Sequence, residues 1–160
     1  MGRESGLWQI RLMKFDSESQ ITSRVIDALY VEAMVLADEA RAYFDEACHD
    51  SRIRMTPLAR VTFSCESLKV TTRLMHVIAW LLNQKAIVRG DGVPSDRVQL
   101  GAAAMSEGAE LAGLPEEAQR VVTASDELYQ RIKRIDKTMH VAQYLPNPAR
   151  QLQSRLMSSL

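Results

Sequence analysis

The sequence of 160 residues lacks any long hydrophobic run. Its longest uninterrupted apolar stretch, residues 77–82, falls far short of the ~20 residues that a transmembrane helix needs. Residues 1–15 mix basic side chains with isolated apolar ones, so no signal-peptide core is present. Hydrophobic residues make up 46% of the chain and charged residues 25%, as in a folded globular domain. We therefore expect a single cytoplasmic domain without a membrane partner.

Residues that support metal binding or catalysis are also scarce. The two cysteines, Cys48 and Cys65, form neither a disulfide framework nor a CxxC pair, and we expect both to be small packing residues. The adjacent pair Cys48 and His49 would diverge by ~100° on a helix and could not jointly bind one ion. The Gly90-Asp91-Gly92 segment has no strand before it and no Lys-Ser/Thr after it, which excludes a phosphate-binding loop. We expect no catalytic residue, no metal site and no cofactor.

The net charge is zero, yet the two signs are separated along the chain. Residues 23–50 are predominantly acidic, whereas between Ser51 and Arg89 the basic residues face only Glu66. Two consecutive segments of opposite sign suit each other as antiparallel neighbours. We therefore interpret the basic segment as a complement to the acidic one and predict no nucleic-acid partner.

Three long segments have helical periodicity. In the first, from about Gln20 to Cys48, apolar residues recur at alternating steps of three and four, which suits a helix and excludes a strand. They are Ile26, Leu29, Ala33, Leu36, Ala40, Tyr43 and Ala47. The third long segment begins at Leu114-Pro115-Glu116 and has its apolar stripe at Val121, Ser125, Leu128, Ile132, Ile135 and Met139. Proline and acidic residues in a first turn are typical of a helix start.

The central segment begins at Thr56-Pro57, an N-cap followed by proline at the first helical position, and ends at Gly90. It carries two apolar stripes. One comprises Val61, Cys65, Leu68, Thr72, Met75, Ala79, Leu82 and Ala86, and the other Val70, Leu74, Val77, Ile78, Leu81 and Val88, with Trp80 beside it. A helix that is apolar on two sides is enclosed by neighbours on both sides or by a partner chain.

These segments predict an all-α fold, an antiparallel three-helix bundle with a long central helix. We expect the bundle to span residues 20–140, preceded by a loosely packed lead segment (1–19) and followed by a flexible tail (141–160). Glycine and proline interrupt residues 91–114, where only 98–111 is rich enough in alanine to suggest a short helix.

The doubly apolar stretch from Leu74 to Leu82 favours a homodimer. The alternative is that the third helix and residues 98–111 cover both stripes within one chain. The residues that we assign to the dimer or core seam are Leu68, Leu74, Met75, Ile78, Trp80, Leu81 and Leu82.

Two polar residues of the central helix stand out. The hydroxyl of Thr72 can return a hydrogen bond to its own helix, so its place on a stripe needs no further partner. Arg73 is different because a buried arginine requires a carboxylate. We expect a structural ion pair with an acidic residue of the first helix (Asp38, Glu39 or Asp45), with direct contact to a partner protein as the alternative.

The sequence of the central helix also resembles that of a known protein family. The pattern lies in residues 67–75 (SLKVTTRLM), 79–82 (AWLL) and 84–86 (QKA), with weaker likeness in 128–132 (LYQRI) and 134–136 (RID). It resembles the regulator of CtrA degradation (RcdA) family, formerly an uncharacterised alphaproteobacterial domain. This resemblance implies a homodimeric three-helix bundle with a disordered tail. It also implies an adaptor at the cell pole that works with a response regulator to deliver cell-cycle proteins to the ClpXP protease.

Three functions remain open at this point. The first is the non-catalytic proteolysis adaptor, and the second is a helical dimer with another regulatory role. The third, from a different class, is a small-molecule or metal sensor with a pocket between helices near His76 and Trp80.

Overall fold

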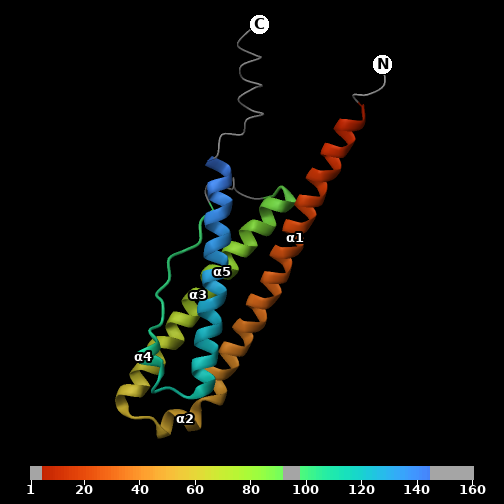
Figure 1. The fold of residues 1–160 in the computed structure, drawn as a ribbon. Helices are drawn as coiled ribbons and strands as arrows, with labels where there is room; N and C mark the ends of the chain where they lie inside the picture. Colours follow the sequence, from red (N-terminus) through yellow and green to blue (C-terminus); the bar gives the residue numbers. More distant parts are fainter. Residues whose placement is uncertain (1–4, 92–97, 145–160) are drawn as a thin grey trace.

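The computed structural model describes residues 5–91 and 98–144, and it shows an all-α three-helix bundle (Figure 1). No strand occurs in the described part. The elements are α1 (Ser5–Ala42), a π-helical turn (Tyr43–Ala47), α2 (His49–Arg54), α3 (Pro57–Arg89), α4 (Gly108–Leu111) and α5 (Glu116–Tyr144). Within these ranges no helix is both long enough and apolar enough to cross a membrane.

The directions of the helices follow from the connections. Helix α1 is antiparallel to α3, but α3 and α5 run in the same direction because residues 98–107 carry the chain back along the bundle (Figure 1). Helix α3 is central and packs against both other long helices, which contact each other less. The N-termini of α3 and α5 therefore lie at the same end of the bundle, next to α2 (Figure 1).

Helix α1 begins earlier than its apolar periodicity predicted, at Ser5 rather than near Gln20. From Ile26 to Tyr43 every predicted stripe residue is buried. Its acidic side chains pair mainly with α5, through Glu32–Arg131 and Glu39–Arg120, whereas Lys85–Asp27 links it to α3 at 2.7 Å. The expected charge complementarity between the first two long segments is therefore mostly a complementarity between the first and the third.

The first helix ends in a π-helical turn (Tyr43–Ala47), where the Cys48 amide donates to the Tyr43 carbonyl at 3.0 Å. The turn directs Tyr43 and Cys48 into a second, smaller core together with Phe63, Leu114 and Ala118. Cys48 is a buried packing residue, as expected. Cys65 is exposed, so the same expectation for it was wrong.

Helix α3 has the predicted ends. The Thr56 Oγ1 accepts a hydrogen bond from the Ala59 amide at 3.2 Å, and Pro57 occupies the first turn. Gly90 closes the helix with φ of +80°, a left-handed conformation that costs glycine little.

Residues 98–107, which we call the strap, are not helical, contrary to the expectation of a short helix over 98–111. Only the four residues of α4 are helical in this region. In a helix, the backbone amides and carbonyls of the strap would form hydrogen bonds with one another. Here some of them form hydrogen bonds with side chains of α5 instead. The Tyr129 hydroxyl donates to the Gly101 carbonyl at 2.8 Å and accepts from the Ala103 amide at 3.1 Å. Asp136 accepts from the Leu100 amide at 3.2 Å and from the Trp80 indole at 2.7 Å.

The strap passes so close to α3 at Gly101 that no side chain fits there. A Cβ atom built on Gly101 would lie 2.8 Å from the His76 ring, whereas one built on Gly108 would meet nothing within 4 Å. We expect Gly101→Ala to lower the free energy of unfolding by about 1–3 kcal/mol, the usual cost of overpacking. Gly108→Ala, the matched control, should cause no loss. Chemical denaturation followed by circular dichroism would measure both, and equal stability of the two variants would contradict the close approach.

Candidate functional site: an apolar face on α1 and α3

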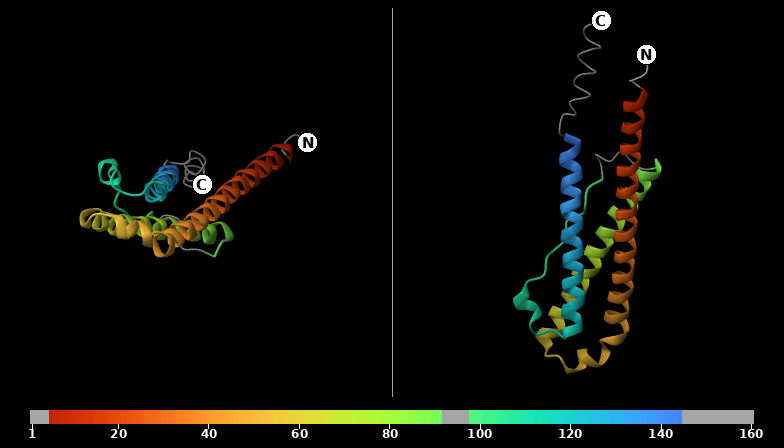
Figure 2. Two further views of the ribbon diagram at one scale, coloured as in Figure 1. Left: turned by 90° about the horizontal axis from the view of Figure 1, so that it is seen from below. Right: turned by 45° about the vertical axis from the view of Figure 1, so that its right-hand side comes forward.

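One apolar stripe of α3 is buried and the other is exposed. Val70, Leu74, Val77, Trp80 and Leu81 form the core between α1 and α5. The other stripe, residues 61–86 at alternating steps of three and four, faces away from the core. Its large members are strongly exposed: Val61 62%, Leu68 68%, Met75 64% and Leu82 48%. In Figure 2 (left), α1 and α5 lie on one side of α3, and no described helix covers the other.

We call this exposed stripe the seam. Its repeat of seven residues is that of a left-handed coiled coil. Large side chains at Val61, Leu68, Met75 and Leu82 alternate with smaller ones. The smaller ones are Cys65, Thr72, Ala79 and Ala86. Alternation of large and small residues allows a second helix to approach closely and interdigitate.

Helix α1 also has exposed apolar side chains. Val31 and Val35 are 60% and 62% exposed, and Met34 is 36% exposed. Large apolar side chains exposed in number usually mark a site of association. We call the seam together with these three residues the apolar face.

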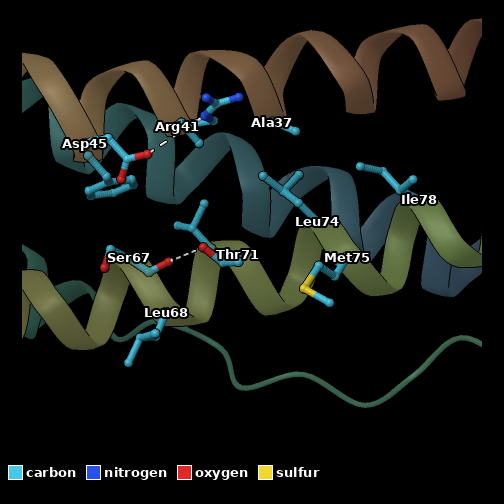
Figure 3. Close-up of a pocket in the computed structure, with 12 residues that line it drawn as sticks. Ala37, Arg41, Asp45, Ser67, Leu68, Thr71, Leu74, Met75 and Ile78 are labelled. Atoms are coloured by element: carbon cyan, nitrogen blue, oxygen red, sulfur yellow. Dashed lines mark hydrogen bonds and ion pairs between the residues drawn. The ribbon is translucent and has the colours of Figure 1, made fainter.

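A groove of about 450 Å³ separates α1 from α3 beside the seam (Figure 3). Ala37 and Leu74 lie between the two helices, while Leu68 and Met75 project along its α3 side. Arg41 and Asp45 line its α1 rim, with 3.9 Å between the guanidinium Nε and the carboxylate. The groove is therefore apolar inside and polar on one edge, as in sites that accept the side chains of a partner helix.

The seven residues assigned to the dimer or core seam thus fall into two groups. Leu74, Trp80 and Leu81 are buried in the core, and Ile78 is half-buried at the groove. Leu68, Met75 and Leu82 belong to the exposed seam. The alternative of complete coverage within one chain is contradicted, because neither α5 nor the strap reaches the seam. The Thr72 hydroxyl donates to the Leu68 carbonyl at 2.9 Å, the return bond expected for it.

Arg73 is fully buried and ties three parts of the chain together. Its Nε donates to the Ala104 carbonyl of the strap at 2.9 Å and lies 2.8 Å from the Asp126 carboxylate of α5. Its remaining nitrogens donate to the hydroxyls of Ser125 and Ser106. The predicted structural ion pair exists, but the predicted partner was wrong. Arg73 lies on the side of α3 that faces α5, so Asp38, Glu39 and Asp45 of the first helix are out of its reach.

A second carboxylate completes this buried network. Glu66, only 1% exposed, accepts from the Ser106 hydroxyl and from Lys69, whose Nζ lies 2.7 Å away. Burial raises the pKa of Asp126, and Arg73 opposes that rise. Burial likewise lowers the pKa of Arg73, against the attraction of Asp126 and Glu66. Arg73 and the two carboxylates thus neutralise one another's charge. Their hydrogen bonds to Ala104 and Ser106 hold the strap in place.

His76 and Trp80, the residues suggested for a sensor pocket, both make structural contacts. The His76 ring packs against Gly101, and the Trp80 indole donates to Asp136. Among residues 5–91 and 98–144, no group of three or more His, Cys, Asp or Glu side chains is placed to hold a metal ion.

We expect Arg73→Ala to lower the free energy of unfolding by about 3–5 kcal/mol, because it leaves buried carboxylates without a counter-charge. The matched control is Arg120→Ala, which removes an exposed arginine paired with Glu39 and Glu117 and should change stability little. Urea denaturation of both variants would test this difference. Similar losses for the two arginines would show that the buried network contributes no more than a surface pair.

Comparison with known proteins agrees with this architecture. The family model of DUF1465, a protein of unknown function, matches residues 17–160. The crystal structure of RcdA from Caulobacter crescentus CB15 is similar to this chain with a TM-score of 0.60 and 32% sequence identity. The similarity covers 72% of this chain and 91% of that one. No curated protein sequence shows a significant match. The chain therefore belongs to the DUF1465 family of RcdA-like helical proteins.

Proposed function

We propose that this chain is a non-catalytic adaptor that helps deliver regulatory proteins to the ClpXP protease. The observation that carries the proposal is the apolar face, a large uncovered surface on a chain whose core is otherwise complete. Similarity to RcdA supports the same role, since the sequence pattern of the central helix resembles that of the regulators of CtrA degradation. An adaptor works by holding its partners together, which raises their effective concentration and requires surfaces rather than reactive groups.

The buried titratable groups support a role without catalysis. Arg73, Glu66 and Asp126 neutralise one another, and Asp136 accepts from Trp80 and from the strap. Each of these groups is engaged in holding the strap between α3 and α5. A general acid or base would instead need an accessible cleft and a free proton site.

The apolar face also supports homodimerisation. In a dimer that pairs two α3 helices along the seam, Leu68 and Met75 of each copy would enter the groove of the other. Removal of each such side chain from water contributes about 1.5–3 kcal/mol, a substantial fraction of the roughly 5–15 kcal/mol net stability of a domain.

Charge reversal within the seam tests the dimer. The double substitution Leu68→Glu and Met75→Glu should produce a monomer, because four carboxylates would have to be buried in the interface. Both positions are solvent-exposed in the single chain, so helicity by circular dichroism should not change. Light scattering coupled to size exclusion would measure the mass.

The control is Val141→Glu, which introduces one glutamate at a position of α5 that is 53% exposed and lies outside the apolar face. This variant should keep the mass of the wild type. A wild-type monomer at micromolar concentration, or a dimer that survives both substitutions, would contradict pairing through the seam.

Reconstitution tests the adaptor role directly. The wild-type chain would be added to purified ClpXP, a response regulator and a cell-cycle regulatory protein. It should accelerate degradation of the cell-cycle regulatory protein at least several-fold. The Val141→Glu variant should act like the wild type. An unchanged degradation rate, together with failure of the immobilised chain to retain ClpX or the response regulator, would contradict the adaptor role. A dimer that forms normally under those conditions would then point to a different regulatory function.

A further inference from the structure

The seam has a pattern of side-chain sizes that complements its own reverse. From Val61 to Ala86, large and small side chains alternate, with a large residue at one end and a small residue at the other. Two copies that run in opposite directions can therefore be aligned so that each large side chain meets a small one. The facing pairs are Val61 with Ala86, Leu68 with Ala79, Met75 with Thr72, and Leu82 with Cys65. A two-fold symmetric interface requires this kind of self-complementarity, because each contact is made twice with the roles of the two copies exchanged.

A parallel pair would lack this complementarity. In a parallel, in-register pair each seam residue faces its own copy, so layers of two large side chains such as Leu68 alternate with layers of two small ones such as Ala79. The large layers would hold the helices apart and leave gaps at the small layers, and unfilled space in an apolar interface is costly. The antiparallel pair instead has one large and one small side chain in every layer. Displacement by seven residues in either direction keeps this alternation but leaves two of the eight seam residues without a seam partner.

The hydroxyl groups on and beside the seam do not need water. Thr72 lies on the seam, and its hydroxyl donates to the Leu68 carbonyl at 2.9 Å. Beside the seam, the hydroxyls of Ser64 and Thr71 donate to backbone carbonyls one turn earlier in α3, at 3.0 and 2.9 Å. Because each donor has a partner within its own helix, this side of α3 can be buried without leaving these hydroxyls unsatisfied.

The charges around the seam favour a second copy over a charged partner. No seam residue is charged. Two lysines flank the seam, and both are paired within the chain. The Lys69 Nζ lies 2.7 Å from the Glu66 carboxylate, and the Lys85 Nζ lies 2.7 Å from the Asp27 carboxylate. A charged partner would find no free opposite charge here, whereas a second copy presents an equally neutral strip.

The two ends of α3 also distinguish the two directions. The steps of three and four continue to Leu58 before the seam and to Arg89 after it, and both side chains are exposed. Antiparallel pairing in the same register places Leu58 opposite the aliphatic stem of Arg89 of the other copy, whereas parallel pairing places the two Arg89 side chains opposite each other. Antiparallel pairing also sets the positive N-terminal end of each α3 dipole, where the first turn has no acidic residue, beside the negative C-terminal end of the other.

We propose that two copies pair through the seam as antiparallel helices, with Leu82 of each copy packed against Cys65 of the other. This inference rests on the homodimer of the proposed function and adds the direction and register of the pair. The two-fold axis crosses α3 between Arg73 and Leu74. The two α2 segments therefore lie at opposite ends of the dimer, about 50 Å apart for a helix of 33 residues.

Cysteine cross-linking tests the register. Leu82→Cys places a second thiol opposite Cys65 of the other copy. After mild oxidation with copper phenanthroline, this variant should give a covalent dimer that dithiothreitol reverses. The wild type should cross-link at least about ten-fold more slowly, because its two Cys65 side chains lie ~25 Å apart along the helix axis. Cys48 is buried and is common to all these proteins.

Leu68→Cys is the matched control, since it makes the same exchange on the same seam but at a position that faces Ala79. Its closest pair of seam cysteines across the dimer would be ~16 Å apart along the axis, so it should cross-link as slowly as the wild type. Addition of Cys65→Ser to Leu82→Cys should abolish the covalent dimer, which would identify the bond as one between positions 65 and 82.

A charge pair tests the same contact without oxidation. Leu82→Glu should give a monomer by light scattering, because a carboxylate would have to be buried against apolar side chains. Addition of Cys65→Lys should restore the dimer, since the two opposite charges would face each other. Addition of Thr72→Lys should not, because that position faces Met75 and lies ~10 Å along the axis from the glutamate of the other copy. These positions are exposed in the single chain, so helicity by circular dichroism should not change.

The outcomes separate this inference from the proposed function. A dimer in which the wild type or Leu68→Cys cross-links as fast as Leu82→Cys would overturn the antiparallel register and leave the homodimer standing. A dimeric Leu82→Cys variant that does not cross-link, or failure of Cys65→Lys to restore the dimer, would overturn it as well. A wild-type monomer would contradict both the homodimer and its register. The degradation assay reports on the adaptor role separately from all of these measurements.

Discussion

Helix α3 has apolar side chains on two sides. Helices α1 and α5 cover only one of these sides. The buried stripe, which includes Val70, Leu74, Val77 and Leu81, carries the hydrophobic contacts with α1 and α5. Each such side chain contributes about 1.5–3 kcal/mol when it leaves water, so the position of the central helix is strongly determined. The seam lies on the other side and remains exposed. The same helix thus organises the core and presents the surface on which the proposed function depends.

The second constraint is the burial of Arg73. A guanidinium inside a bundle is costly unless it is paired and fully hydrogen-bonded. Here Asp126 and Glu66 supply the charge, and Ser106, Ser125 and the Ala104 carbonyl accept its hydrogen bonds directly or through the network. Two of these partners belong to the strap, so the arginine holds a non-helical segment against the bundle. That segment returns the chain to the end of the bundle where α3 begins and makes α5 parallel to α3 (Figure 1).

These constraints leave large apolar side chains exposed. They lie along the seam of α3 and at Val31, Met34 and Val35 of α1. Helices α3 and α5 begin at the same end of the bundle, and Glu116 and Glu117 in the first turn of α5 compensate the positive end of its dipole.

Much of the site could be predicted from local sequence. The caps of α3 follow from Thr56, Pro57 and Gly90, whose conformational preferences act within a few residues. The apolar residues of both stripes were identifiable because periodicity shows which residues share a face. Periodicity could not show which stripe is buried, since Leu68 and Leu74 have the same side chain and differ only in what lies opposite. The exposed arginines Arg52, Arg54 and Arg60 were visible as part of a basic segment, which was interpreted as a complement to the acidic first helix.

The sequence by itself determined three long helices, both ends of the central one, and the requirement that Arg73 find a carboxylate. Tertiary structure decided which carboxylate, because Asp126 lies 53 positions along the chain and only the packing of α5 brings it within 2.8 Å. It also decided that alanine-rich residues 98–107 are extended. Helix propensity is worth a few tenths of a kcal/mol per residue, less than the hydrogen bonds that Tyr129, Asp136 and Arg73 make with this backbone. Local conformational preferences determined where the helices form. Long-range contacts determined which faces of these helices are buried and which remain exposed.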